Sequence, residues 1–304
     1  MQIEAELKNA VVLAMFGTSV EHALAGLLNI RDRMVGRFPE TPVHIAFTSN
    51  IIRRVWQERA KDPEYVLSHP EIPNDILNVR GPLAAIADLQ DAGFDSIVVQ
   101  AVHIAPAEEY VDLCAHVAGL NSIKTIKSNS GLFRNLVVGR PALGTFDTRY
   151  PYTADIKTAA RSLFSDASLA RQEGAALVYL GHGNSYVPAR NIYVEFAAEM
   201  RRQYPDTPIV MTTLEGIPSY DEAIAELQGH NLRKVLLKPF LIAAGGHVAK
   251  DMMGDQPESL KNRLEHAGFA VHPLLKGLGE QDDFAQIFVQ HAADAANDAA
   301  IELR

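Results

Sequence analysis

Three side chains that commonly bind metal ions each follow a short apolar run in the second half of the chain. His182 follows "ALVYLG", Glu215 ends "IVMTTLE", and His247 follows "LKPFLIAAGG". Two imidazoles and a carboxylate suit a borderline divalent metal ion such as Co²⁺, Fe²⁺, Ni²⁺ or Zn²⁺. A single histidine after a strand is more often a hydrogen-bonded structural residue. Three such residues in one half of the chain, each beside glycine, favour a shared site.

Glycines surround these three side chains. They are Gly181, Gly183, Gly216, Gly245 and Gly246. Because glycine has no Cβ, it permits sharp turns and leaves room for a ligand to approach the backbone. The pattern therefore predicts that a large, flat ligand lies near the metal, with Gly183, Gly245 and Gly246 among its contacts.

The surrounding sequence predicts an α/β fold. Short runs rich in β-branched and other apolar residues alternate with segments of helical spacing, which indicates parallel sheets covered on both faces. The expected strands lie within residues 9–17, 42–49, 95–104, 134–143, 175–181, 208–216, 234–242 and 270–277. Ligands of such sheets bind beyond the carboxyl ends of the strands, where the three polar side chains are expected.

The order of elements occurs twice, which predicts two similar doubly wound domains. "FPETPV" in the first half matches "YPDTPI" in the second, each between a helix and a strand. We expect an N-terminal domain over residues 1–147, a C-terminal domain over 148–304, and a cleft between them that holds the site. Chance similarity between two α/β halves is the alternative explanation.

Aligning the halves identifies what faces the histidines. Phe16 takes the position of His182, and Glu109 takes that of His247, so the first half offers an aromatic face and a carboxylate. The neighbouring Glu108 is an alternative to Glu109, and either could simply be a carboxylate at the start of a helix. The remaining histidines fall mostly on expected helices or loops, although His103 also lies near a strand end.

Two further groups in the first half are candidates for binding an anionic substrate. Arg53 and Arg54 follow the second expected strand, where guanidinium groups could bind carboxylates or pair with the protein's own acids. Gly17, Thr18 and Ser19 offer backbone and hydroxyl donors after the first strand.

Composition excludes several classes of function. The formal net charge is −9 and no Lys/Arg block occurs, which argues against nucleic-acid and anionic-membrane partners. Cys114 is the single cysteine, so a thiolate metal cage cannot form. There is no apolar run of membrane-spanning length and no nucleotide-binding glycine motif. We expect a cytoplasmic protein, unless a signal peptide has already been removed; the helix expected over 282–303 leaves a homo-oligomer open.

Several motifs resemble one enzyme family over nearly the whole chain. "GHG", "TTLEGIP" and "LKPFLIAAGGHVAKDMMGD", together with "FGTS", "TSNIIRR" and "VVQAVHIAPAEEY", are similar to the anaerobic cobalt chelatases. These belong to the class II tetrapyrrole chelatases, which include ferrochelatase. The resemblance implies two doubly wound domains with the active site between them, His182 and His247 as paired histidines at the metal, and Glu215 as the carboxylate beside them.

The resemblance also implies a reaction. Such enzymes insert a metal ion into sirohydrochlorin, or its precorrin-2 form, without ATP, as a lyase reaction of anaerobic cobalamin biosynthesis. Neutral imidazole suits this chemistry because it can bind a metal ion or accept a pyrrole proton. We therefore expect Co²⁺ as the substrate metal and His182, His247 and Glu109 as catalytic residues. Insertion of Fe²⁺ to give sirohaem and a non-catalytic metal or haem carrier are the alternatives.

Overall fold

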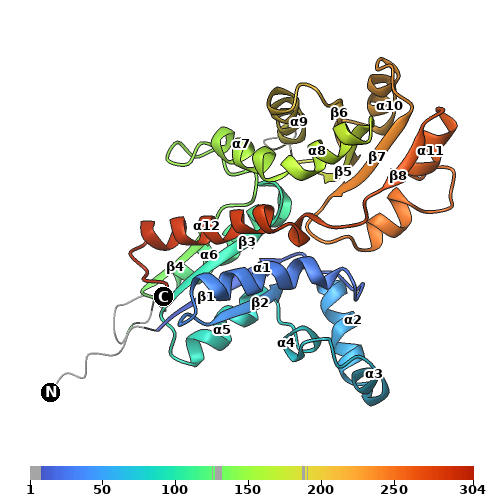
Figure 1. Cartoon of the computed structure of the whole chain (residues 1–304). Helices are drawn as coiled ribbons and strands as arrows, with labels where there is room; N and C mark the ends of the chain where they lie inside the picture. The colour runs from blue at the N-terminus through green and yellow to red at the C-terminus, as the bar shows by residue number, and fades with distance from the viewer. Residues whose placement is uncertain (1–7, 125, 127–131, 187–188, 190) are drawn as a thin grey trace.

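The structure is a computed structural model that describes residues 8–124, 126, 132–186, 189 and 191–304. Two lobes are visible in Figure 1, each built on one parallel sheet with helices on both faces. The elements of the first lobe are β1 (Asn9–Met15), α1 (Leu24–Arg37), β2 (Val43–Phe47), α2 (Asn50–Ala60), α3 (Pro63–Ser68), α4 (Asn74–Leu77), α5 (Pro82–Asp91), β3 (Ser96–Val102), α6 (Glu108–Ser122) and β4 (Asn135–Gly139).

The second sheet is built from the later part of the chain. Its elements are α7 (Tyr152–Ser162), α8 (Phe164–Gln172), β5 (Ala176–Gly183), α9 (Ile192–Gln203), β6 (Ile209–Glu215), α10 (Tyr220–Gln228), β7 (Lys234–Phe240), the π-helix η2 (Val248–Met252), α11 (Leu260–His266), β8 (Ala270–Pro273), the short 3₁₀ helix η3 (Leu278–Glu280) and α12 (Asp282–Asp298). Each strand expected from the sequence overlaps a strand of the structure, and the predicted α/β class with two parallel sheets is confirmed.

The two sheets have the same topology and equivalent register. The strand orders are β2-β1-β3-β4 and β6-β5-β7-β8, with all neighbours parallel. In the first sheet Met15 pairs with Phe47 and Val102, and in the second Gly181 pairs with Thr213 and Phe240. The pairing agrees with the alignment of the two halves of the sequence. Phe16 and His182 are therefore equivalent residues, because Phe16 directly follows Met15 and His182 directly follows Gly181.

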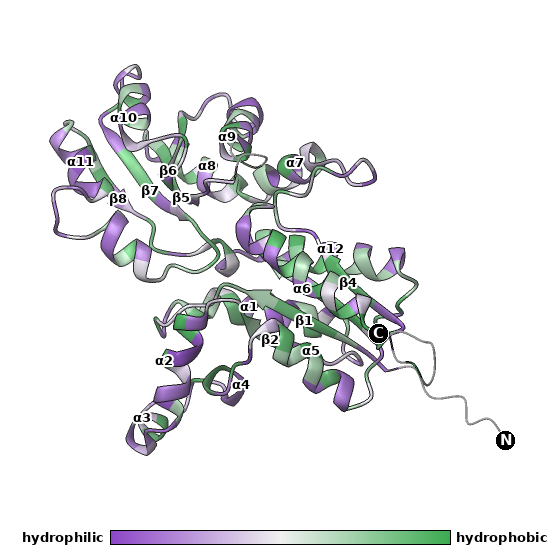
Figure 2. Ribbon diagram, turned by 180° about the vertical axis from the view of Figure 1, so that it is seen from behind, coloured by the Kyte–Doolittle hydropathy of each residue, from purple (hydrophilic) through white to green (hydrophobic). Residues whose placement is uncertain are grey.

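Helices cover both faces of each sheet, which explains why the central strands are largely apolar. In the first lobe, α5 and α6 pack on one face and α1 and α12 on the other. In the second lobe, α8 and α9 cover one face, and α10 and α11 the other. Figure 2 shows hydrophobic colours along the strands and mixed colours on the outer helices. In the described residues, no helix is both long and apolar enough to cross a bilayer.

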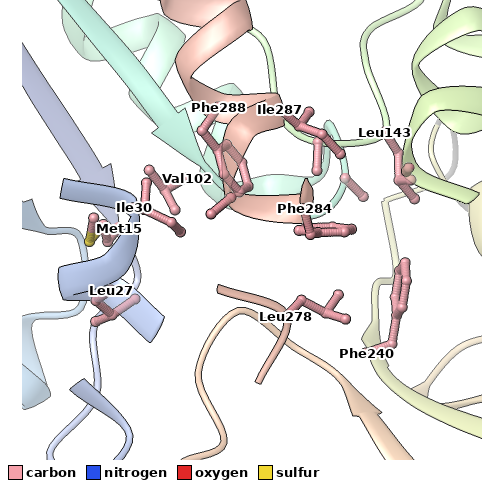
Figure 3. Packing of buried hydrophobic residues seen from close by; sticks show 14 of the residues in the cluster. Met15, Leu27, Ile30, Val102, Leu143, Phe240, Leu278, Phe284, Ile287 and Phe288 are labelled. Atoms are coloured by element: carbon pink, nitrogen blue, oxygen red, sulfur yellow. The ribbon is translucent and has the colours of Figure 1, made fainter. Parts of the chain in front are cut away.

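The last helix connects the two lobes. After β8 the chain returns to the first lobe, where α12 packs against α1, β3 and β4 (Figure 1). Phe284 and Phe288 of α12 belong to one buried cluster with Val102 of the first sheet and Phe240 of the second (Figure 3). The boundary predicted at residue 147 falls between the two sheets, while α12 lies on the lobe that precedes it. The lobes thus share a core beneath the cleft.

Candidate active site

A cavity of about 780 Å³ lies between the lobes at the carboxyl ends of the central strands. The loops after β1, β3, β5 and β7 all contribute to its wall. Residues predicted for the site that line it are Phe16, Gly17, Thr18, Ser19, Glu109, His182, Gly183, Glu215, Gly245, Gly246 and His247; Glu108 lines it too. The volume falls within the range of about 300–1,000 Å³ typical of small-molecule sites.

His182 and His247 form a pair in this cavity. Their ring centroids are 5.0 Å apart and the ring planes are inclined at 84°. His182 is half-buried at the end of β5, and its Nδ1 is 3.3 Å from the carbonyl oxygen of Gly183. His247 directly precedes η2, and its Nδ1 is 2.8 Å from Oδ2 of Asp251. In both rings Nε2 is the nitrogen that remains available for a ligand.

Glu215 lines the same cavity at the end of β6. Its neighbour across the sheet is Gly183, the residue after His182. The carboxylate is exposed, and within the described part of the chain no group of three or more His, Cys, Asp or Glu side chains is arranged to hold a metal ion. The structure therefore brings the two histidines together and leaves Glu215 nearby, and its place among the metal ligands stays a prediction.

The glycines beside the histidines have distinct physical roles. Gly183 has φ +79°, and a Cβ on it would lie 1.7 Å from the carbonyl oxygen of Glu215, so the contact between β5 and β6 requires glycine. A Cβ on Gly245 would lie 2.8 Å from Thr18 Oγ1 of the other lobe. A Cβ on Gly246 would meet nothing within 4 Å. Internal packing thus explains Gly183 and Gly245, and Gly246 alone of the three faces open space.

The loop after β1 presents an aromatic ring to the cavity. Phe16 is 46% exposed, which is unusual for a large apolar side chain beside a core strand. The buried Trp56 fixes this loop by donating a hydrogen bond from Nε1 to the Thr18 carbonyl oxygen over 2.8 Å. Arg59 donates to the Ser19 carbonyl oxygen over the same distance. An exposed ring on a braced loop is suited to stack on a flat ligand.

Glu108 and Glu109 form the first turn of α6 and both line the cavity. Glu108 Oε1 accepts a hydrogen bond from Ser185 Oγ of the second lobe over 3.1 Å. No hydrogen bond or ion pair joins Glu109 to another residue that the structure describes. Glu109 is therefore the less constrained of the two carboxylates, and the catalytic role of either one stays a prediction.

The two arginines predicted to bind substrate lie away from the cavity wall. Arg53 donates hydrogen bonds to the carbonyl oxygens of Phe47 and Thr48 and to the side chain of Asn50. Arg54 is exposed at the surface of α2. Among the described residues lining the cavity, Lys250 of η2 is the one that carries a Lys or Arg side chain. The role of Arg53 and Arg54 in binding substrate stays a prediction.

Two side chains at the site went unassigned in the sequence. His103 lines the cavity just after β3; it is 7% exposed and neither ring nitrogen has a hydrogen-bond partner among the described residues. Burial lowers the pKa of His103 to about 4, so this imidazole is neutral near pH 7. Asp251 lines the main cavity and a second one of about 600 Å³, which shares His182, Glu215 and His247. Asp251 lies four residues after His247, and this helical spacing was the sequence signal that could have revealed Asp251.

Comparison with known proteins gives a consistent picture over the whole chain. A sequence model of the cobalt chelatase (CbiK) family matches residues 9–297. The chain is 31% identical to the sirohydrochlorin cobaltochelatase CbiKC of Nitratidesulfovibrio vulgaris, over 95% of this chain and 91% of that protein. It is 26% identical to the sirohydrochlorin cobaltochelatase of Salmonella typhimurium, over 97% and 99% of the respective chains.

Solved structures share the fold. SirB from Bacillus subtilis, solved with Fe³⁺, superposes with a TM-score of 0.58 at 11% identity, over 98% of this chain and 100% of that one. The sirohydrochlorin chelatase SirB from Bacillus subtilis subspecies spizizenii, in complex with cobalt, gives a TM-score of 0.55 at the same identity, over 98% and 99%. These two likenesses concern the fold alone. Because the family match extends over both lobes and includes both histidines, the chain belongs to the cobalt chelatase (CbiK) family.

Proposed function

We propose that this protein inserts Co²⁺ into sirohydrochlorin without using a nucleotide. The observation that carries the proposal is the pair His182 and His247, exposed to a cavity whose other wall holds Phe16 and Glu109. The family membership and the names of the two cobaltochelatase relatives support the same reaction. Co²⁺ is a substrate here, so the protein must bind it and also release it.

The two histidines are suited to hold the metal without trapping it. Imidazole is a borderline ligand that binds Co²⁺ well, and two imidazoles leave most coordination positions open for the pyrrole nitrogens. Glu215 would add a carboxylate from the neighbouring strand when the ion arrives. A site with few protein ligands is easier for the macrocycle to displace than a closed site with four.

The first lobe would bind the macrocycle and remove its protons. Phe16 would stack on the ring, and Lys250 would pair with one of its carboxylates. Insertion of one Co²⁺ releases two pyrrole N–H protons, so a base beside the ring lowers the barrier. Glu109 would take one of these protons on the lobe opposite the histidines.

Carboxylates in the cavity also compensate the positive charge of the incoming Co²⁺. Glu108, Glu109, Glu215 and Asp251 line it, and Lys250 supplies the one ammonium among its described lining residues. This excess of negative charge attracts a divalent cation into a site that lacks a full set of ligands.

The test is turnover measured by absorbance. Purified protein is incubated with excess sirohydrochlorin and Co²⁺ without ATP, and then with Fe²⁺ in place of Co²⁺. We expect many metallated products per protein and a higher initial rate with Co²⁺. A single stoichiometric complex would indicate a metal or haem carrier, and a higher rate with Fe²⁺ would indicate a ferrochelatase.

Glu215→Ala separates the metal site from the macrocycle site. We expect weaker Co²⁺ binding by calorimetry and an unchanged KM for sirohydrochlorin, because the change removes one oxygen ligand on the metal side. Co²⁺ affinity equal to that of the parent would remove Glu215 from the metal site.

A further inference from the structure

The hydrogen bond between Asp251 and His247 determines which imidazole nitrogen faces a ligand. Asp251 Oδ2 lies 2.8 Å from His247 Nδ1. A carboxylate accepts hydrogen bonds, so the neutral imidazole carries its proton on Nδ1 and keeps its lone pair on Nε2. Metal-binding histidines commonly have such an outer carboxylate, which orients the ring and strengthens it as a donor.

We propose that Asp251 is a positioning residue for metal transfer: it holds His247 as the Nδ1–H tautomer so that Nε2 binds the Co²⁺. The inference rests on the proposed function, because it takes His247 as a ligand of the substrate metal. It goes further in assigning a role to a residue outside the predicted ligand set and in naming the nitrogen that binds.

A simple surface ion pair is a poor explanation of this contact. The side chains of His247 and Asp251 are 49% and 31% exposed, and exposed pairs of this kind contribute about 0–1 kcal/mol to stability. Both residues line the cavity that contains His182. His247 directly precedes η2 and Asp251 lies within it. This element is a π-helix, and such helices are rare and often lie at functional sites.

His182 is held in a similar way but more weakly. Its Nδ1 is 3.3 Å from the Gly183 carbonyl oxygen, a longer contact to an uncharged acceptor. Both rings therefore present Nε2, but among the described residues a carboxylate contacts His247 and none contacts His182. His247 is then the stronger donor to the metal and His182 the one that lets go first, which orders the release of Co²⁺ to the macrocycle.

Histidine tautomers can be read directly by NMR of ¹⁵N-labelled, metal-free protein. The parent is expected to show His247 with its proton on Nδ1. In Asp251→Ala we expect a shift toward the Nε2–H form, a loss of about 10–100-fold in Co²⁺ affinity and an unchanged KM for sirohydrochlorin. Asp251→Asn keeps an acceptor but loses the charge, so it should keep the tautomer and lose less affinity.

Three further variants separate the possible causes of failure. Asp255→Ala removes an exposed carboxylate just after η2 that lines neither cavity, and it should behave like the parent. His247→Ala should lose more Co²⁺ affinity than His182→Ala. The positioning role is overturned if the parent has the Nε2–H form, or if Asp251→Ala keeps both tautomer and affinity while His247→Ala loses affinity. If His247→Ala binds Co²⁺ like the parent, the proposed metal site fails and the inference fails with it.

Discussion

Ser185 Oγ donates a hydrogen bond to Glu108 Oε1 over 3.1 Å, and this contact links the two lobes at the rim of the cavity. Ser185 follows β5 of the second lobe, and Glu108 begins α6 of the first. The bond gives Glu108 a structural partner, whereas Glu109 has none among the described residues. The two adjacent carboxylates can therefore be distinguished by experiment.

Glu109→Gln should slow metal insertion while leaving the affinities for Co²⁺ and sirohydrochlorin close to those of the parent. The amide keeps the shape of the side chain but cannot accept a pyrrole proton, and losing a general base typically costs about 10²–10⁴-fold in rate. Steady-state turnover and calorimetric Co²⁺ binding measured on the same preparation test this expectation.

Glu108→Gln is the matched control. Its amide oxygen can still accept the bond from Ser185, so the rate should stay within a few-fold of the parent. Equal slowing by both changes would mean that general negative charge, rather than one base, assists insertion.

His182→Ala and His247→Ala should each remove most insertion activity without unfolding the protein. Both rings lie at the cavity, and neither fills the buried core, so circular dichroism and thermal unfolding should stay near those of the parent. We expect a rate loss of about 10²-fold or more, as for other groups that act on the reacting atoms. Rates close to the parent in both variants would place the active site elsewhere.

His103 should make the fold sensitive to acid. Burial lowers its folded pKa to about 4, while the imidazole of the unfolded chain has the ordinary value of about 6.5. As pH falls through this range the unfolded state takes up the proton and the folded state does not. The free energy of unfolding should thus drop by about 3 kcal/mol between pH 6.5 and pH 4 through this residue.

The repeat supplies the variant that measures this contribution. Leu241 occupies the position equivalent to His103, so His103→Leu places there the residue that the other lobe uses. Urea unfolding at pH 7 and pH 4.5 should show a smaller acid-induced loss in His103→Leu than in the parent. His116→Gln is the control, because the His116 ring is exposed on α6. This variant should show the same acid-induced loss of stability as the parent. Identical losses in the parent and His103→Leu would refute the effect.

Asp155→Asn should destabilise the junction between the lobes. Burial raises the pKa of Asp155, but hydrogen bonds from His291 and Arg140 outweigh it, and the pKa is lowered overall. Arg140 Nε lies 2.7 Å from Asp155 Oδ2, and the same guanidinium reaches Asp294 of α12 over 2.8 Å. Removing one charge from this buried network should cost about 3 kcal/mol in unfolding free energy.

An exposed pair provides the comparison for that variant. Asp88→Asn disrupts the contact with Arg80, whose side chain is more than half exposed, and should change stability by less than about 1 kcal/mol. A loss as small in Asp155→Asn would show that the junction does not depend on the buried charges. The ionised form of Asp155 stabilises the fold. The difference in unfolding free energy between the parent and Asp155→Asn should therefore shrink as pH falls through the lowered pKa of Asp155.

The strands and their register were predictable because they depend on local pattern. Runs of apolar residues set the eight strands, and the alignment of the two halves correctly paired Phe16 with His182. The histidines came together because neighbouring parallel strands end at one edge. These features follow from hydrogen bonding and burial, which a sequence records residue by residue.

The rest depends on tertiary contacts that the sequence does not record. The positions of Arg53 and Arg54 after the second strand suggested cations for a substrate. The sequence did not show that Arg53 would instead donate hydrogen bonds to backbone carbonyl oxygens of its own lobe. Gly183 suggested space for a ligand, yet it allows β5 to approach Glu215 of β6. A helix over 282–303 was expected, and α12 lies within it at 282–298, but the sequence did not show that this helix packs against β3 and β4 of the first sheet.

The return of α12 to the first lobe has a consequence for how the protein is made. At about 5–20 residues per second, the ribosome needs on the order of 10 s to synthesise the chain between β4 and α12. During that time the nascent first sheet has no helix over the β3 and β4 surface that Phe284 and Phe288 later cover. The lobe synthesised first is therefore completed last, and the cleft takes its final form only when the second lobe has already emerged.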